Sequence, residues 1–121
     1  MSINLVIVDD ENEILSLLER FFSRIDGYKV TTFSNPVTAL SRLPEDTDVV
    51  LSDVMMPQMN GLDLLPKLLA KKKDLKVVIM TAYSTLDKVL DAHRGGATHY
   101  VMKPFDSLQS LQKKIEEVAN S

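Results

Sequence analysis

The sequence predicts an α/β fold in which five helices cover a doubly wound, five-stranded parallel sheet. Two observations lead to this fold. Strand-like and helix-like segments alternate five times along the chain, and four of the five strand-like segments are nearly continuous apolar runs. Such runs are typical of parallel strands, because helices bury both faces of the sheet. The sequence shows no internal repeat or linker, so residues 1–121 are expected to form a single domain.

The composition narrows the class of protein. Apolar residues make up 45% of the chain and charged residues 26%, which is ordinary for a globular domain. The absence of cysteine excludes disulfides and thiolate metal sites. A formal net charge of −3 argues against direct binding to nucleic acid. The sequence shows neither a signal peptide nor an apolar run long enough for a membrane span, so we expect a soluble cytoplasmic protein.

The first 43 residues contain two predicted strands, over 5–8 and 29–33, each followed by a helix. The first helix covers about 12–25. Its apolar stripe comprises Ile14, Leu17, Leu18, Phe21, Phe22 and Ile25. The second runs from Pro36 to about Leu43, because Asn35 is a favourable N-cap and proline is tolerated at the first helical position.

The central strand is predicted over 49–52 and ends at Asp53. In the helix that follows, Asn60 and Asp63 have the spacing of a capping box, which would start the helix at Gly61. Pro66 would then occupy the sixth helical position and remove a hydrogen bond. Either the helix bends at Pro66 or it starts later than the cap suggests.

The last part of the chain holds two more strands, over 77–80 and 99–102, and two more helices. One helix is expected from Ser84 to the Gly95–Gly96 pair. The final helix has Asp106 as its expected cap. Its apolar stripe comprises Leu108, Leu111, Ile115 and Val118.

Reactive side chains lie where the predicted strands end. They are Asp9, Asp10, Asp53, Thr81 and Lys103. Because the carboxyl ends of parallel strands share one edge of a sheet, we expect these groups to converge there. Three acids need a countercharge, and a hard divalent cation, most plausibly Mg²⁺, would supply it. A metal, an ammonium and a hydroxyl together are suited to phosphoryl oxygens, and an aspartate can accept the phosphoryl group as an acyl phosphate.

Four segments of the chain carry a resemblance to a known family. They are Val8-Asp9-Asp10-Glu11, the run from Ser52-Asp53 through Pro57 to Asn60-Gly61, Met80-Thr81-Ala82, and Lys103-Pro104-Phe105. In this order and spacing, they resemble the receiver domain of two-component response regulators. The resemblance covers the whole chain. It implies a flavodoxin-like or CheY-like fold with strand order 2-1-3-4-5.

The resemblance also implies roles for the residues at the predicted edge. Asp53 matches the phosphoacceptor, which takes its phosphoryl group from a histidine kinase or a phosphotransfer protein. Asp10 and Asp53 match residues that bind Mg²⁺ directly. Asp9 matches the acid that binds the metal through a water molecule. Met55 matches the position whose backbone carbonyl binds the metal.

Further positions match the response to phosphorylation. Thr81 corresponds to the hydroxyl that bonds the phosphoryl group, Lys103 to its ion-pair partner, and Tyr100 to the aromatic switch residue. Met55 and Tyr83 correspond to positions that flank the attacking water. Since neither can act as a base at neutral pH, we expect slow hydrolysis of the acyl phosphate. The bond between Lys103 and Pro104 is cis in the family.

The function implied is therefore a phosphorylation switch that catalyses chemistry only on its own Asp53. Phosphorylation is expected to change the surface formed by the helix over 84–95, the strand over 99–102 and the last helix. That surface would control a partner or output domain, with dimerisation on phosphorylation.

Two other functions fit part of the pattern less well. A Mg²⁺-dependent phosphohydrolase keeps its nucleophile as the first acid of an Asp-x-Asp motif after the first strand, whereas Asp9 and Asp10 are adjacent. A flavodoxin-like flavin carrier needs hydroxyls and amides in that loop, and the three acids at positions 9–11 would repel a phosphate. Turnover of an external phosphomonoester would favour the first alternative, and a yellow protein the second.

Overall fold

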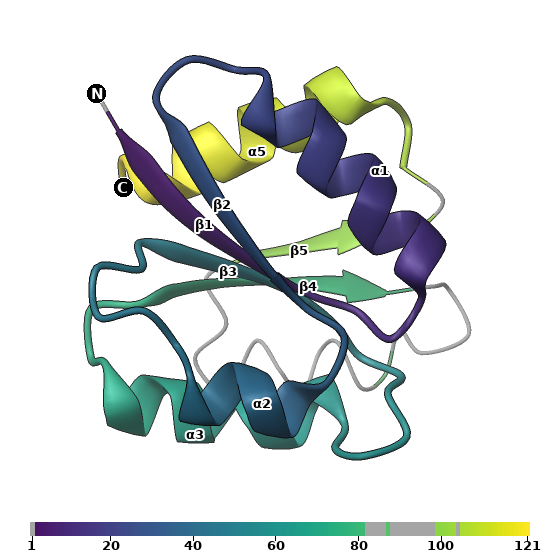
Figure 1. Ribbon diagram of the computed structural model, residues 1–121, viewed down its shortest axis with the longest axis vertical. Helices are drawn as coiled ribbons and strands as arrows, with labels where there is room; N and C mark the ends of the chain where they lie inside the picture. Colours follow the sequence, from purple (N-terminus) through teal and green to yellow (C-terminus); the bar gives the residue numbers. More distant parts are fainter. Residues whose placement is uncertain (1, 82–86, 88–98, 104) are drawn as a thin grey trace.

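Five parallel strands form one sheet in the computed structural model, which describes residues 2–81, 87, 99–103 and 105–121. The strands are β1 (Ile3–Val8), β2 (Tyr28–Phe33), β3 (Val49–Asp53), β4 (Lys76–Thr81) and β5 (His99–Met102). Their order is β2-β1-β3-β4-β5 (Figure 1). This confirms the predicted fold class and strand order. The strands begin or end one or two residues beyond the predicted runs, except β5, which matches its prediction.

Helices cover both faces of the sheet. They are α1 (Asn12–Ser23), α2 (Pro36–Ser41), α3 (Gly61–Lys71) and α5 (Leu108–Ala119). One face packs against α1 and α5, and the other against α2 and α3, so the sheet separates two apolar cores (Figure 1). The helix expected over 84–95 lies outside the described residues. Within the described part of the chain, no helix has both the length and the apolar character needed to span a membrane.

The predicted helix starts are confirmed at α2 and α3. The Asn35 side chain accepts a hydrogen bond from the Val37 N–H (2.8 Å), and the Asn60 side chain accepts one from the Leu62 N–H (2.7 Å). Helix α3 begins at Gly61 and contains Pro66 in its interior, so the later start is excluded. The packing of Leu64, Leu65 and Leu68 in the core compensates for the hydrogen bond that the proline cannot donate.

Two details of the helix predictions are wrong. Ser107, not Asp106, caps α5, because its hydroxyl accepts a hydrogen bond from the Ser110 N–H (3.0 Å). In α1, Leu15 is buried while Leu17 is 39% exposed. Ile14, Phe21 and Ile25 pack against the core beside the buried Leu15, Leu18 and Phe22. The predicted stripe is therefore confirmed except at Leu17, which lies at its edge.

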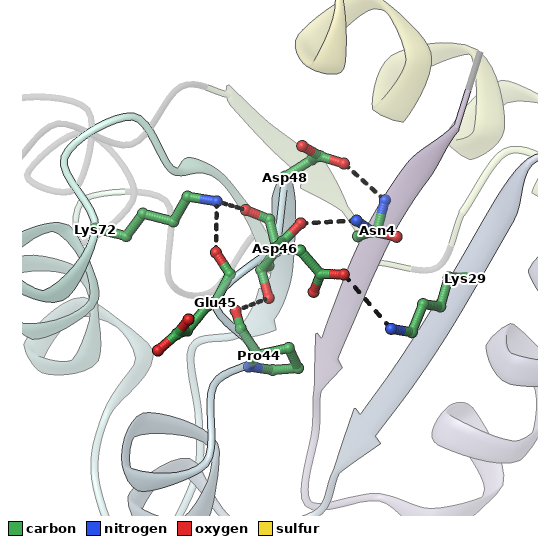
Figure 2. Close-up of polar contacts among 8 residues, drawn as sticks. Asn4, Lys29, Pro44, Glu45, Asp46, Asp48 and Lys72 are labelled. Atoms are coloured by element: carbon green, nitrogen blue, oxygen red, sulfur yellow. Dashed lines mark hydrogen bonds and ion pairs between the residues drawn. The ribbon is translucent and has the colours of Figure 1, made fainter.

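The amino ends of the strands meet a tightly bonded loop over 44–48 (Figure 2). Asp48 accepts a hydrogen bond from the Asn4 N–H (2.8 Å), and Asp46 pairs with Lys29 (3.5 Å). The Lys72 ammonium donates to the backbone carbonyls of Glu45 and Thr47. Each charged group drawn at this end of the sheet therefore has a local partner, except the Glu45 carboxylate, which is exposed.

Candidate functional site

Three carboxylates cluster at the carboxyl ends of β1 and β3. Oxygen atoms of Asp9, Asp10 and Asp53 all lie within 4.8 Å of one another. The strand register explains this closeness, because Val8 pairs with Ser52 in the neighbouring strand and the acids follow directly. Asp9 is fully buried and Asp53 is 6% exposed, so two of these charges are largely removed from water.

Among the residues that the structure describes, Lys103 supplies the positive charge of this cluster. It follows β5 and extends across the edge of the sheet. Its ammonium lies 2.8 Å from Asp9, 3.4 Å from Asp53 and 3.8 Å from Glu11. The backbone fixes its starting point, since the Lys103 N–H donates to the carbonyl of Thr81 (2.7 Å). One cation is thus shared among three carboxylates, which leaves the site with excess negative charge.

This arrangement shifts the pKa values of Asp53 and Lys103. Burial raises the pKa of Asp53 from 3.8 to about 6, the neighbouring Lys103 charge opposes the rise, and the Asp9 charge adds to it. Burial by itself would lower the pKa of Lys103, but the hydrogen bond with Asp9 and the charges of Asp53 and Asp9 raise it overall. Asp53 is therefore a carboxylate whose negative charge is poorly compensated at neutral pH, as expected where a further cation binds.

The donor set fits a hard cation. Asp9 uses one oxygen to accept the Glu11 N–H (2.9 Å) and the other to accept the Lys103 ammonium (2.8 Å). Asp10 is less buried than either of its partners. Carboxylate oxygens with room for water are the ligands that Mg²⁺ prefers. Asp10 and Asp53 are accordingly the acids best placed to bind a metal directly.

The other predicted site residues are placed as follows. Thr81 is buried at the end of β4, beside the cluster. The Met55 side chain is 57% exposed in the loop after β3, and Tyr100 is 40% exposed on β5. Their roles in metal binding, switching and lifetime stay predictions. Tyr83 and Pro104 lie outside the described residues, as does the predicted cis bond.

The structure adds two residues to which sequence reasoning gave no role. Glu11 approaches Lys103, and its signal was its place in the acidic run 9–11, within the first of the four family segments. At Gly61, a Cβ atom would lie only 2.1 Å from the carbonyl oxygen of Asp53. The start of α3 therefore rests against the backbone of the central acid. A glycine that directly follows a helix cap was the available clue.

Comparison with known proteins agrees with this geometry. The family model for the response regulator receiver domain matches residues 5–116. Response regulator SaeR of Staphylococcus aureus (strain USA300) is 37% identical over 102 residues, which cover 84% of this chain and 44% of the relative. The chain thus spans less than half the length of the curated relatives that it matches.

Solved structures show the same likeness. A response regulator receiver domain protein from Clostridium thermocellum is 30% identical with a TM-score of 0.87, covering 98% of this chain and 94% of that chain. The N-terminal signal receiver domain of a two-component system response regulator from Bacteroides fragilis is also 30% identical, with a TM-score of 0.88 and 98% of each chain covered. The chain belongs to the receiver domain family of two-component response regulators.

Proposed function

We propose that this receiver domain is switched by transfer of a phosphoryl group from a phosphohistidine to Asp53, and that a histidine kinase or a phosphotransfer protein is the donor. The observation that carries this proposal is the buried Asp53 carboxylate at the end of β3, close to two further acids and to Lys103. A carboxylate in such a place lowers the stability of the fold, and such costs are typical of residues that serve chemistry.

The transfer makes one bond and breaks another. An oxygen of Asp53 attacks the phosphorus, the P–N bond of the phosphohistidine breaks, and the departing imidazole nitrogen takes up a proton. The product is a mixed anhydride that carries about two negative charges. Lys103 lies 3.4 Å from Asp53 and is the residue available to pair with the new charge, while the Thr81 hydroxyl would donate to a phosphoryl oxygen.

The metal proposed for this site is Mg²⁺. Asp10 and Asp53 would hold it directly, with the Met55 carbonyl, and Asp9 would act through water. Bound there, Mg²⁺ would offset the charge of the phosphoryl oxygens. The two existing hydrogen bonds of the Asp9 carboxylate support its indirect role, because neither of its oxygens is without a partner.

The output would come from the surface formed by residues 84–95, β5 and α5. The half-exposed Tyr100 ring on β5 would turn inward as Thr81 moves toward the phosphoryl group. The changed surface would then act on an output domain or a partner, with dimerisation on phosphorylation. We propose no activity on an external substrate, since the reaction ends on the domain's own Asp53.

The test is phosphorylation by acetyl phosphate with Mg²⁺, followed by intact mass measurement. We expect one phosphoryl group, removed by hydroxylamine because acyl phosphates are labile to it, and no adduct without Mg²⁺. Asp53→Asn should abolish the adduct, and Asp10→Asn should weaken Mg²⁺ binding. The matched control is Asp48→Asn, which changes an acid at the opposite end of the sheet and should leave the adduct intact.

An adduct that resists hydroxylamine, or that persists in Asp53→Asn, would show that another residue is the acceptor. An unchanged Mg²⁺ affinity in Asp10→Asn would remove that residue from the metal site.

A further inference from the structure

We infer that Ser52 is a positioning residue for Asp53, and that it acts through the peptide group that joins Asp53 to Val54. This inference rests on the proposed function of Asp53 and goes beyond it. Ser52 is 1% exposed, and its hydroxyl donates to the carbonyl oxygen of Asp53 (3.0 Å). A buried hydroxyl with this partner fixes the direction of that carbonyl.

The same peptide group orients the carboxylate. A peptide bond is planar, so its carbonyl and its N–H point in opposite directions and cannot turn separately. Here the N–H belongs to Val54, and it donates to the Oδ1 atom of Asp53 (2.9 Å). By holding the carbonyl, Ser52 therefore also aims the N–H that holds the Asp53 side chain.

The start of α3 restricts rotation of the same peptide group, because Gly61 packs against it. A Cβ atom at Gly61 would lie 2.1 Å from the Asp53 carbonyl oxygen, so the backbone of Gly61 sits directly against it. The Gly61 N–H donates to the Val54 carbonyl (2.8 Å), which ties the loop after β3 to the helix. The peptide thus has a hydrogen bond on its carbonyl, another on its N–H and little space in which to rotate.

The consequence is a choice between the two carboxylate oxygens. Oδ1 accepts the Val54 N–H and faces Lys103, whereas Oδ2 accepts no hydrogen bond among the described residues. The fixed peptide keeps these two environments distinct. One oxygen stays oriented by the backbone while the other remains available to attack phosphorus or to bind metal. Ordered reactive groups gain rate because fewer wrong orientations are sampled.

The experiment compares Ser52→Ala with Thr47→Val. Each variant removes one buried hydroxyl that donates to a backbone carbonyl, and the Thr47 bond, to Pro44 (2.7 Å), lies at the opposite end of the sheet. Ser52→Thr keeps the hydroxyl and serves as the rescue. The first readout is the rate constant of phosphorylation by acetyl phosphate at saturating Mg²⁺. We expect it to fall about tenfold in Ser52→Ala and to stay near the wild-type value in the other two variants.

The second readout is hydrogen exchange of the Val54 amide, which needs no phosphoryl transfer. We expect exchange about tenfold faster in Ser52→Ala than in Thr47→Val, because only the first variant frees this peptide. Equal exchange in the two variants, or equal phosphorylation rates, would overturn the role of Ser52. A wild-type chain that gains no phosphoryl group would instead contradict the proposed function, and the exchange comparison would still decide whether Ser52 positions Asp53.

Discussion

The two ends of the sheet carry similar residues in opposite electrostatic arrangements. At the amino ends of the strands, Asp46 pairs with Lys29, Asp48 accepts a backbone N–H, and Lys72 donates to two carbonyls (Figure 2). At the carboxyl ends, the Lys103 ammonium pairs with two of the three clustered carboxylates, Asp9 and Asp53, and with the nearby Glu11. At the first end each charged group drawn in Figure 2 except the exposed Glu45 carboxylate has a local partner, whereas the second end has an excess of negative charge.

The difference separates what holds the fold from what performs the chemistry. At the amino end, charged side chains hold the loop over 44–48 through short hydrogen bonds and ion pairs, which stabilise the fold. At the carboxyl end, burial of Asp53 beside Asp9 opposes ionisation and raises its pKa to about 6. Such a site is ready to accept a metal ion, because the cation relieves a cost that is already present in the folded state.

Removing one cation from each end should give the largest contrast. Lys103→Met leaves Asp9 and Asp53 buried without a countercharge, and we expect the free energy of unfolding to fall by roughly 2–3 kcal/mol at pH 7.5. Lys72→Met removes hydrogen bonds to neutral carbonyls and should cost only about 1 kcal/mol. Urea denaturation of both variants without metal measures the difference.

Added Mg²⁺ sharpens this comparison. It should restore part of the stability lost in Lys103→Met and none of that lost in Lys72→Met, because only the first variant changes the acid cluster. Equal losses in the two variants, or equal responses to Mg²⁺, would mean that the two ends do not differ as described.

Glycine substitutions test the backbone at each end. In Gly61→Ala, the new Cβ meets the Asp53 carbonyl, so we expect a loss of about 1–3 kcal/mol and slower phosphorylation. Gly27 has a φ of 91° in the turn before β2, and Gly27→Ala should cost about 1–2 kcal/mol without slowing phosphorylation. Denaturation and phosphorylation rates measured together distinguish the two. Normal phosphorylation in Gly61→Ala would show that α3 does not constrain Asp53.

The rim of the carboxyl end is expected to set the lifetime of the signal. Met55 is exposed there. By the resemblance, Met55 and Tyr83 both flank the path of the water molecule that attacks the phosphorus. Replacing both, as Met55→Asn with Tyr83→Glu, supplies groups that can orient water. Loss of the phosphoryl group should become about tenfold faster, a barrier change of about 1.4 kcal/mol. Decay measured by intact mass at the wild-type rate would mean that these positions do not control the lifetime.

The sheet and the site edge could be predicted because their signals are local. Apolar runs such as Val49, Val50 and Leu51 identify buried parallel strands, and an acid or a lysine directly after a strand marks the shared edge. The caps at Asn35 and Asn60 are local signals of the same kind.

The remaining features depend on contacts between distant segments. Nothing in the sequence shows that Lys72 reaches the loop over 44–48, since it appears only as one of three successive lysines. The choice of Ser107 over Asp106 as cap depends on backbone direction after β5, because both residue types are good caps. The link from the Ser52 hydroxyl to the Asp53 carboxylate passes through a backbone group, which carries no sequence signal.

The most direct test of the contrast is one substitution made at both ends, Asp53→Asn and Asp48→Asn, with stability measured without metal. The folded-state pKa of Asp53, about 6, exceeds its ordinary value of 3.8, so its ionisation lowers stability as pH rises through that interval. At pH 7.5, Asp53→Asn should therefore stabilise the domain by about 1–2 kcal/mol and flatten its pH dependence between about pH 4 and 6. Asp48→Asn weakens a charge-assisted hydrogen bond to Asn4 and should destabilise by about 0.5–1 kcal/mol. Changes of opposite sign support the account, whereas a loss of stability in Asp53→Asn would contradict it.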